Sequence, residues 1–393
     1  MSDPAAATGS PAGPPRRVFI NGMSIGTGGG YTVGRELARY LAIARPDWEF
    51  TFGLIRDHRL QSEMESESLP DNVTLFWAPA RTADPRQRMR YEAGELTEGI
   101  NRERYDAVVQ LNGMILSGVQ APTLAHFQDP FPYRPEAWTT LKQRVSAWMK
   151  RRENRRALKQ AAVCGWTSHY LEELVCGHHR VRPERSIVFY NGVPDAWIDR
   201  ARQEPPAWGT RPMKLVTVSN VWPYKRQSLV VEALAMLRKR SGLESLEYHV
   251  IGGGEQADLD DVQRLAERLG VGDAVHVEGR VPDSRVEEAM ATSRAMPLMS
   301  VCESFGIPTI EAMAYGTPVV VADCCALPEV CGEAAIVSPV DDPRALADNL
   351  ERLLSDSALV DRLRQLGQER VLRFQWKAIG QQMADAVASF MPS

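Results

Sequence analysis

Short apolar, β-branched runs alternate with longer segments of helical periodicity throughout this chain, and that alternation limits its fold more than any other feature. Strands are predicted at RRVFING, WEFTFGLI, NVTLFWAP, YDAVVQLNG and APTLAHFQD, while TVGRELARYLAIARP places Leu37, Tyr40, Leu41 and Ile43 near one face of a helix. Strands separated by helices indicate βαβ units, and therefore a parallel sheet.

The same alternation begins again after residues 189–212, a segment rich in proline and glycine that has no sustained period and is the predicted linker. A chain of 393 residues is long enough for two or three domains. We therefore expect an α/β protein with a tail at 1–16 and two Rossmann-like, doubly wound domains at 17–195 and 196–374. Ligands of such sheets bind outside the carboxyl ends of the strands, so the cleft between the domains is the expected site.

The composition is that of a globular protein and excludes several classes. A formal charge of −4 argues against a general nucleic-acid binder, whose surface would be basic. No apolar run approaches the about 18 residues of a membrane span, and the first residues, MSDPAAATGSPAGPPRR, lack the apolar core of a secretion signal. Six cysteines without a C-x-x-C pair fit reduced thiols in a cytoplasmic protein. The CGHH at 176–179 is either a surface turn or half of a metal site.

Residues 302–323, CESFGIPTIEAMAYGTPVVVAD, combine a strand-end loop, a helix start and two acids. Pro308 is predicted as the first helical residue, approached through Gly306, and unpaired N–H groups at such a start suit a phosphate or diphosphate. Glu303 and Glu311 can reach the same end of this helix. Because carboxylates repel phosphate, we expect Glu303 and Glu311 to bind hydroxyl groups of the ligand instead. A sugar nucleotide offers phosphates and hydroxyl groups together.

Several segments, in order, resemble those of family 4 retaining glycosyltransferases, which have the GT-B fold. They are GGGYTVGRELARYLA, HFQDPFPY, YNGVPD, VSNVWPYKRQSLVVEAL, VIGGGEQADL, VHVEGRVPD, the E-x7-E of Glu303 and Glu311 with AMAYGTPVVVAD and ALPEVCGEAA, and RFQWKAIGQQMADAV. The resemblance covers most of the chain. It implies transfer of a sugar from a nucleoside-diphosphate sugar without a metal or other cofactor, and a last helix at about 375–393 that packs back on the first domain.

The resemblance also implies roles for second-domain residues. Lys225 would neutralise the donor diphosphate, Glu311 would accept the ribose hydroxyls, and Glu303 would bind the transferred sugar near the reacting carbon. The family has an arginine where this chain has Asn220, which leaves Arg226 or backbone amides to complete the cation clamp. The remaining implied donor contacts are Ser304, Phe305, Gly306 and Ile307 at the helix start, and Gly279, Arg280 and Val281 around the base.

First-domain residues have expected roles as well. His126, at the end of a predicted strand, would contact the donor sugar at the catalytic centre, and Asp129 would orient it or bind the acceptor. Gly28, Gly29 and Gly30 would let the backbone approach the diphosphate.

A basic helix is predicted at 141–160, where eight Lys or Arg residues accompany the single acid Glu153. With Trp148 and Met149 it suits an anionic membrane or a lipid-phosphate acceptor, although a solvated helix face explains the same pattern. RNA is a poorer partner because the rest of the chain is not basic.

The sequence thus predicts a cytoplasmic glycosyltransferase, peripheral at the membrane if the basic helix binds there, with a polysaccharide or lipid-linked precursor or a small natural product as acceptor. A GT-B sugar-nucleotide epimerase and a non-catalytic sugar-nucleotide-binding protein are the alternatives. A nicotinamide-dependent oxidoreductase fits less well, because GTGGGYTVG departs from G-x-G-x-x-G in either register. The donor base, the sugar and the oligomeric state stay open.

Overall fold

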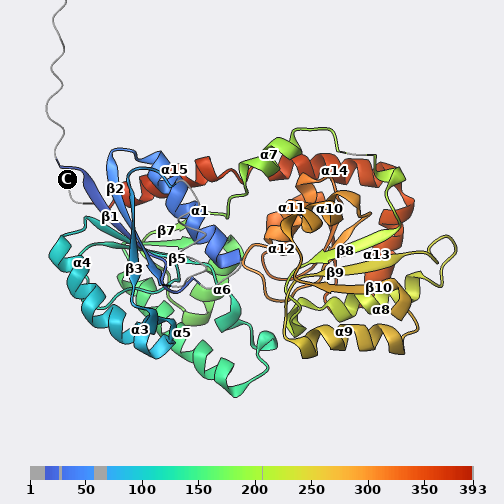
Figure 1. Ribbon diagram of the computed structural model, residues 1–393, viewed down its shortest axis with the longest axis horizontal. Coiled ribbons are helices and arrows are strands. Elements are labelled where there is room, and N and C mark those ends of the chain that lie inside the picture. The colour runs from blue at the N-terminus through green and yellow to red at the C-terminus, as the bar shows by residue number, and fades with distance from the viewer. Residues whose placement is uncertain (1–13, 26–28, 57–68, 206, 392–393) are drawn as a thin grey trace, which may run out of the picture.

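The computed structural model describes residues 14–25, 29–56, 69–205 and 207–391, which form two α/β domains (Figure 1). The first contains a seven-stranded, all-parallel sheet in the order β3-β2-β1-β4-β5-β6-β7. Its strands are β1 (Arg16–Asn21), β2 (Trp48–Ile55), β3 (Val73–Ala78), β4 (Ala107–Gln110), β5 (Thr123–Phe127), β6 (Val163–Trp166) and β7 (Ser186–Val188). The strand order reverses between β1 and β4, so the ligand crevice of this domain is expected there.

The second domain contains two three-stranded parallel sheets, β10-β9-β8 and β11-β12-β13. A parallel bridge between Leu215 and Ala295 joins β8 to β11, so that the order across both sheets is again that of a Rossmann-like domain. The strands are β8 (Lys214–Val218), β9 (Glu247–Ile251), β10 (Val275–Gly279), β11 (Met296–Leu298), β12 (Val319–Ala322) and β13 (Ala335–Ser338). The point of reversal here lies between β8 and β11.

Helices cover both sheets because the strands are buried and apolar on both faces. In the first domain they are α1 (Gly29–Ala44), α3 (Pro85–Tyr91), α4 (Thr97–Glu103), α5 (Leu141–Gln160) and α6 (His169–His179). In the second they are α8 (Gln227–Leu237), α9 (Gln256–Arg268), α10 (Asp283–Thr292), α11 (Ile307–Ala314), α12 (Leu327–Cys331), α13 (Pro343–Ser355) and α14 (Ser357–Val371). Within the described ranges, each helix is too short or too polar to cross a lipid bilayer.

The segment predicted as a linker contains a helix, α7 (Asp195–Ala201), which its lack of a sustained period did not indicate. Ile198 and Ala201 are buried one turn apart, and the helix is held by packing against the second domain rather than by its own propensity.

The last helix, α15 (Trp376–Ala388), lies against α1 of the first domain, far from it in sequence (Figure 1). The Trp376 ring stacks on Tyr40 with 6.3 Å between centroids. Gly380 packs directly on the backbone of Tyr40, where an added Cβ would come within 2.6 Å of its carbonyl oxygen. The chain therefore crosses between the domains twice, which ties them together at the side away from the cleft.

Candidate donor and acceptor site

Three loops of the second domain meet at the carboxyl ends of β8, β9 and β10. The Val221 N–H donates to the Gly253 carbonyl at 2.8 Å, and the Gly252 N–H donates to the Gly279 carbonyl at 2.8 Å. Gly252 has φ +148°, and a Cβ there would lie 2.0 Å from the Ser219 carbonyl oxygen, so only glycine permits this approach. The sequence GGG after β9 thus allows the loops that follow β8, β9 and β10 to pack in direct contact.

Lys225 and Glu303 form an ion pair at this edge of the sheet. The Lys225 Nζ lies 2.5 Å from the Glu303 Oε1, and the side chains are only 12% and 14% exposed. A hydrogen bond of 2.9 Å from the Val301 N–H to the Tyr224 carbonyl holds the two loops together. The two residues predicted to act on the donor are therefore in direct contact, although 78 positions separate them in sequence.

The helix α11 begins at Ile307, one residue earlier than predicted, with Pro308 inside its first turn. Gly306 precedes it with φ +91°, and no side chain caps its N-terminal N–H groups. Pro308 has no N–H and the Thr309 N–H donates to the Gly306 carbonyl at 2.9 Å, so the Ile307 N–H is the donor at this helix start that can reach an anion at the cleft. Phe305, by contrast, is 1% exposed and packs edge-on against Phe374, so only its backbone can take part in binding.

Glu311 lies one turn into α11, and its carboxyl group forms no hydrogen bond or ion pair with any other described residue, although its backbone carbonyl accepts a hydrogen bond from the Tyr315 N–H. Burial, followed by the negative charges of Asp283 and Glu287, raises the pKa of its carboxyl group to about 8. A carboxyl group held in this way without a partner is costly for the fold, and such sites are often functional.

Replacing Glu311 with Gln should stabilise the protein in a pH-dependent manner. The folded state keeps this proton up to about pH 8, whereas the unfolded chain loses it near 4.5, so the native state loses stability as the pH rises between these values. Glu311→Gln removes that loss. Thermal unfolding should show little difference between the proteins at pH 4.5 and a rising advantage of the variant up to pH 8. An advantage that is the same at every pH would contradict this account.

Asn220 and Arg280 flank the glycine loop after β9. Both side chains come within 4 Å of the position of a Cβ on Gly253: the Arg280 Nε at 3.7 Å and the Asn220 Oδ1 at 3.9 Å. No acid among the described residues pairs with Arg280. Arg226 is instead engaged with Asp341 at 2.5 Å, so Arg280 is the cation that stands beside Asn220 without a partner.

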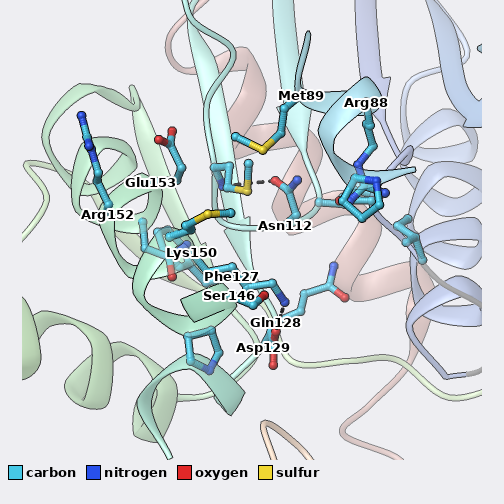
Figure 2. A pocket seen from close by; sticks show the side chains of 18 of the residues that line it. Arg88, Met89, Asn112, Phe127, Gln128, Asp129, Ser146, Lys150, Arg152 and Glu153 are labelled. Atoms are coloured by element: carbon cyan, nitrogen blue, oxygen red, sulfur yellow. Dashed lines mark hydrogen bonds and ion pairs between the residues drawn. The ribbon is translucent and has the colours of Figure 1, made fainter. Parts of the chain in front are cut away.

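The first domain has a cavity of about 550 Å³ at the carboxyl ends of β1, β4 and β5, at the reversal of strand order (Figure 2). Its apolar wall consists of Ile25, Met89, Leu111, Met114, Phe127, Pro132, Trp148 and Met149. Polar groups lie at one side, where the Lys150 Nζ is 2.8 Å from the Asp129 Oδ2 and Gln128 is close by (Figure 2). Gly30, predicted to approach the diphosphate, also lines this cavity, whereas Gly28 lies outside the described residues.

A buried acid that the sequence did not single out borders the same cavity. Glu92 begins a short π-helical segment (Glu92–Leu96), a distortion that is frequent at functional sites. Its Oε1 accepts a hydrogen bond of 3.2 Å from the Asn21 Nδ2, which also donates to the Gln110 Oε1 at 3.0 Å. Burial raises the pKa of the Glu92 carboxyl group. Asn21 and Gln110 are the last residues of strands β1 and β4. A polar residue at the end of a buried strand is the sequence feature that could have indicated this polar cluster.

His126 lies near the end of β5, as predicted, but its side chain is only 1% exposed. Burial lowers its pKa to about 4, so the ring is neutral. Its Nδ1 accepts a hydrogen bond of 3.0 Å from the Gln128 Nε2, and Gln128 lines the cavity. Its side chain lies in the interior because β5 is buried on both faces, and there it orients Gln128; its contact with the donor sugar stays a prediction. Asp129 contacts Lys150 rather than His126.

Contacts across the cleft join the two domains beside the donor loop. The Glu329 carboxylate accepts hydrogen bonds from the His169 and Tyr170 N–H groups, at 2.8 and 2.7 Å, at the start of α6. The Arg134 Nη2 donates to the Cys324 Sγ at 3.1 Å, and the Thr167 hydroxyl reaches the Ser304 carbonyl at 3.4 Å. These contacts hold the first domain, which contains the cavity, next to the loops of the second domain.

Residues 199–370 match the family model described as "Glycosyl transferases group 1". HepE from Anabaena, solved in complex with UDP and glucose, superimposes with a TM-score of 0.75 at 19% identity, over 95% of this chain and 100% of that one. The glycosyltransferase WaaG, involved in lipopolysaccharide biosynthesis, gives a TM-score of 0.69 at 17% identity, over 94% and 99% of the two chains. The fold is GT-B.

Curated relatives with higher identity match over shorter stretches. D-inositol 3-phosphate glycosyltransferase from Corynebacterium efficiens is 32% identical over 213 residues, 52% of this chain and 49% of that protein. Phosphatidyl-myo-inositol mannosyltransferase from Mycobacterium leprae is 31% identical over 164 residues, 41% and 42% of the two chains. The chain spans about half the length of the curated relatives it matches.

In the GT-B frame, the loops of the second domain and the cavity of the first face the same cleft. At the carboxyl edge of the second-domain sheet lie all of these predicted donor residues: Asn220, Lys225, Glu303, Glu311 and the segments 279–281 and 304–307.

The CGHH segment ends α6: the Cys176 thiol is buried, and the His179 Nε2 pairs with the Tyr133 hydroxyl at 2.9 Å. It is neither a surface turn nor one of the metal-ligand clusters found among the described residues.

Proposed function

We propose that this protein is a glycosyltransferase that moves a sugar from a nucleoside-diphosphate sugar to an acceptor hydroxyl. The observation that carries the proposal is the partly buried Lys225–Glu303 pair beside the uncapped start of α11, at the cleft. The Lys225 ammonium and the Ile307 N–H match the diphosphate of such a donor, and the carboxylates at the same sheet edge match its hydroxyls. The group 1 match over this domain and the names of the relatives support the same class.

Donor binding would exchange the partners of the ion pair. In the free protein Lys225 and Glu303 neutralise each other. A bound diphosphate offers Lys225 a stronger partner, which frees Glu303 to accept hydroxyl groups of the transferred sugar. Glu311, which has no partner of its own among the described residues, would accept the ribose hydroxyls. Both acids then gain hydrogen bonds only when the donor is present.

Arg280 would supply the second cation of the site. The chain has Asn220 where the resembling family has arginine, and the Arg280 guanidinium stands beside Asn220 over Gly253. Lys225 and Arg280 together would stabilise the negative charge that develops on the departing diphosphate. Positive charge from these two side chains makes a divalent metal unnecessary in the proposed reaction.

The acceptor would occupy the first-domain cavity, with its hydroxyl directed at the cleft. That hydroxyl attacks the anomeric carbon, the bond to the diphosphate breaks, and the hydroxyl proton passes to an oxygen of the leaving nucleoside diphosphate. Retention of configuration by front-face attack, and assignment to family 4, rest on the resemblance alone. The anomeric configuration of the product, read by NMR, decides the stereochemistry.

An amphiphilic acceptor at a membrane surface fits the cavity best. Leu141, Val145, Trp148 and Met149 form an exposed apolar stripe on α5, from 42% to 75% exposed, and the last two also line the cavity. The same helix carries eight Lys or Arg residues. We therefore place the protein at the cytoplasmic face of an anionic membrane, which also agrees with its six free cysteines.

The stripe should govern binding to lipid vesicles. Replacing Leu141 and Trp148 together with Ala should weaken sedimentation with phosphatidylglycerol vesicles about tenfold, because two exposed apolar side chains no longer enter the interface. Leu269→Ala, an exposed apolar residue of the second domain, is the matched control. Equal binding of all three proteins would exclude this surface.

A thermal-shift screen with UDP-, GDP-, ADP- and dTDP-sugars tests the proposed function. At a hundredfold excess over Kd the matching donor adds about 2.7 kcal/mol to the free energy of unfolding, and therefore raises Tm by several degrees. Release of the nucleoside diphosphate from that donor then separates a transferase from a non-catalytic binding protein, and recovery of an altered nucleotide sugar would indicate an epimerase. If none of the four donors shifts Tm, the proposed function is wrong.

A further inference from the structure

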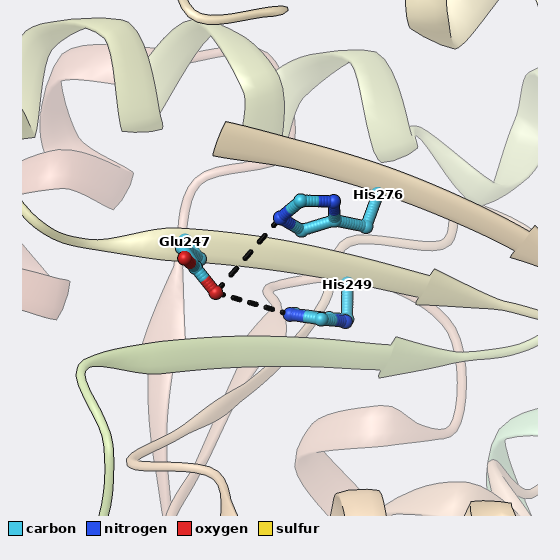
Figure 3. A group of neighbouring side chains, drawn as sticks. All are labelled: Glu247, His249 and His276. Carbon is cyan, nitrogen blue, oxygen red and sulfur yellow. Dashed lines mark hydrogen bonds and ion pairs between the residues drawn. The ribbon is translucent and has the colours of Figure 1, made fainter. Parts of the chain in front are cut away.

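The second domain carries a cluster of two histidines and an acid at the edge of its sheet, away from the cleft. Glu247 and His249 lie on β9, and His276 lies on the edge strand β10 in register with His249. Residues at alternate positions share a face, so all three side chains project from the same side of the sheet (Figure 3). Glu247 is the first residue of β9, at the end opposite to the loops that face the donor.

The ligand atoms of the three side chains converge. The Glu247 Oε2 lies 3.4 Å from the His249 Nε2 and 3.8 Å from the His276 Nε2, and the three atoms all lie within 4.8 Å of one another (Figure 3). Two ligand atoms about 2 Å from a tetrahedral metal are about 3.3 Å apart, so small rotations of the half-exposed Glu247 and His276 toward the more buried His249 would bring all three into coordination.

A second layer of contacts orients the inner histidine. The His249 Nδ1 donates a hydrogen bond of 2.7 Å to the Glu278 Oε1, and the other ring nitrogen, Nε2, faces Glu247. Arg285 in turn donates to both oxygens of Glu278, at 2.9 and 2.7 Å. A carboxylate that fixes the tautomer of a histidine from behind is the usual support of a metal-binding imidazole. Because Arg285 satisfies Glu278, Glu247 is the acid left for a cation.

We propose that Glu247, His249 and His276 bind one divalent metal ion of the zinc type. Two imidazole nitrogens and a carboxylate oxygen that converge within 4.8 Å form a donor set suited to one cation, and imidazole favours Zn²⁺, Cu²⁺ or Ni²⁺ over Mg²⁺ or Ca²⁺. Glu247 and His276 are 49% and 41% exposed, so water reaches the remaining coordination positions. The ion would join the edge strand β10 to β9 and stabilise the second domain, independently of the proposed transfer reaction.

Metal titration of the full-length, untagged, chelator-treated protein tests the site. Co²⁺ should bind at one ion per chain with the visible absorption of four- or five-coordinate cobalt, and Zn²⁺ should displace it. His249→Ala and His276→Ala should each abolish that signal. Glu278→Gln should weaken binding about 10- to 100-fold, as expected for a supporting residue. His178→Ala, an exposed histidine of the first domain, should bind like the wild type.

Thermal unfolding gives a second measure that does not depend on the cobalt spectrum. Zn²⁺ should raise Tm of the wild type and of His178→Ala, and leave Tm of His249→Ala unchanged. Saturable binding that survives in a His249→Ala, His276→Ala double variant would place the ion elsewhere, and the absence of saturable binding would show that the cluster holds only a proton. Either result overturns the proposal.

Discussion

Replacing Lys225 with Ala is expected to lower the rate of nucleoside-diphosphate release about 10²- to 10³-fold, the usual effect of removing a charge stabiliser from a departing group. The ion pair adds a second cost. Without Lys225, the partly buried Glu303, 14% exposed, is left with no cation beside it and disfavours the incoming diphosphate. We therefore expect weaker donor binding as well as slower chemistry, measured as KM and kcat with the donor identified by thermal shift.

A double variant separates these two effects. Adding Glu303→Ala to Lys225→Ala removes the unpaired acid, so donor binding should recover in part while kcat stays low. The double variant should then be less impaired in binding than the single effects predict, since the two residues act as one unit. Lys239→Ala, an exposed lysine of the same domain, is the control and should behave as the wild type. Activity of Lys225→Ala within a factor of three of the wild type would refute the assigned role.

Replacing Arg280 with Ala is expected to cost about 10²-fold in kcat, because the second cation of the proposed site is lost. Moving the positive charge from position 280 to position 220 tests this assignment more sharply than removing the charge does. The Asn220 and Arg280 side chains both lie over Gly253, so Asn220→Arg in the Arg280→Ala background should restore at least tenfold of the lost activity. The rescued enzyme would return the cation to the position that the resembling family uses.

Two further variants keep the rescue interpretable. Asn220→Gln in the Arg280→Ala background lengthens the side chain without a charge and should restore nothing. Arg268→Ala removes an exposed arginine at the end of α9 and should leave kcat unchanged. If Arg280→Ala retains full activity, or if Gln rescues as well as Arg, the charge of Arg280 plays no part in the reaction.

Several features of the fold were predictable from local sequence. Periodicity indicated the strands and helices of both domains, since burial on both faces makes each strand of a parallel sheet a continuous apolar run. The basic helix was predicted at 141–160, and α5 has those bounds. Helix α7 was missed because its seven residues carry only two buried positions, too few to establish a period.

The candidate site divides in the same way. Lys225, Glu303 and Glu311 stand in segments whose order along the chain already points to a sugar nucleotide. The sequence placed His126 at the end of a strand, and it lies near the end of β5. Only the packing around that strand showed that its side chain is buried and that Gln128 reaches the cavity.

By itself, then, the sequence determined the parallel α/β architecture, and its resemblance to a known family implied the residues of the proposed donor site. The architecture follows from periodicity, which depends on local structure alone. Only the tertiary structure decided that Lys225 meets Glu303, that Arg280 stands beside Asn220, and that Glu247, His249 and His276 converge. Each of these contacts joins separate loops or strands, and the order of strands in a sheet, rather than spacing along the chain, decides which loops become neighbours.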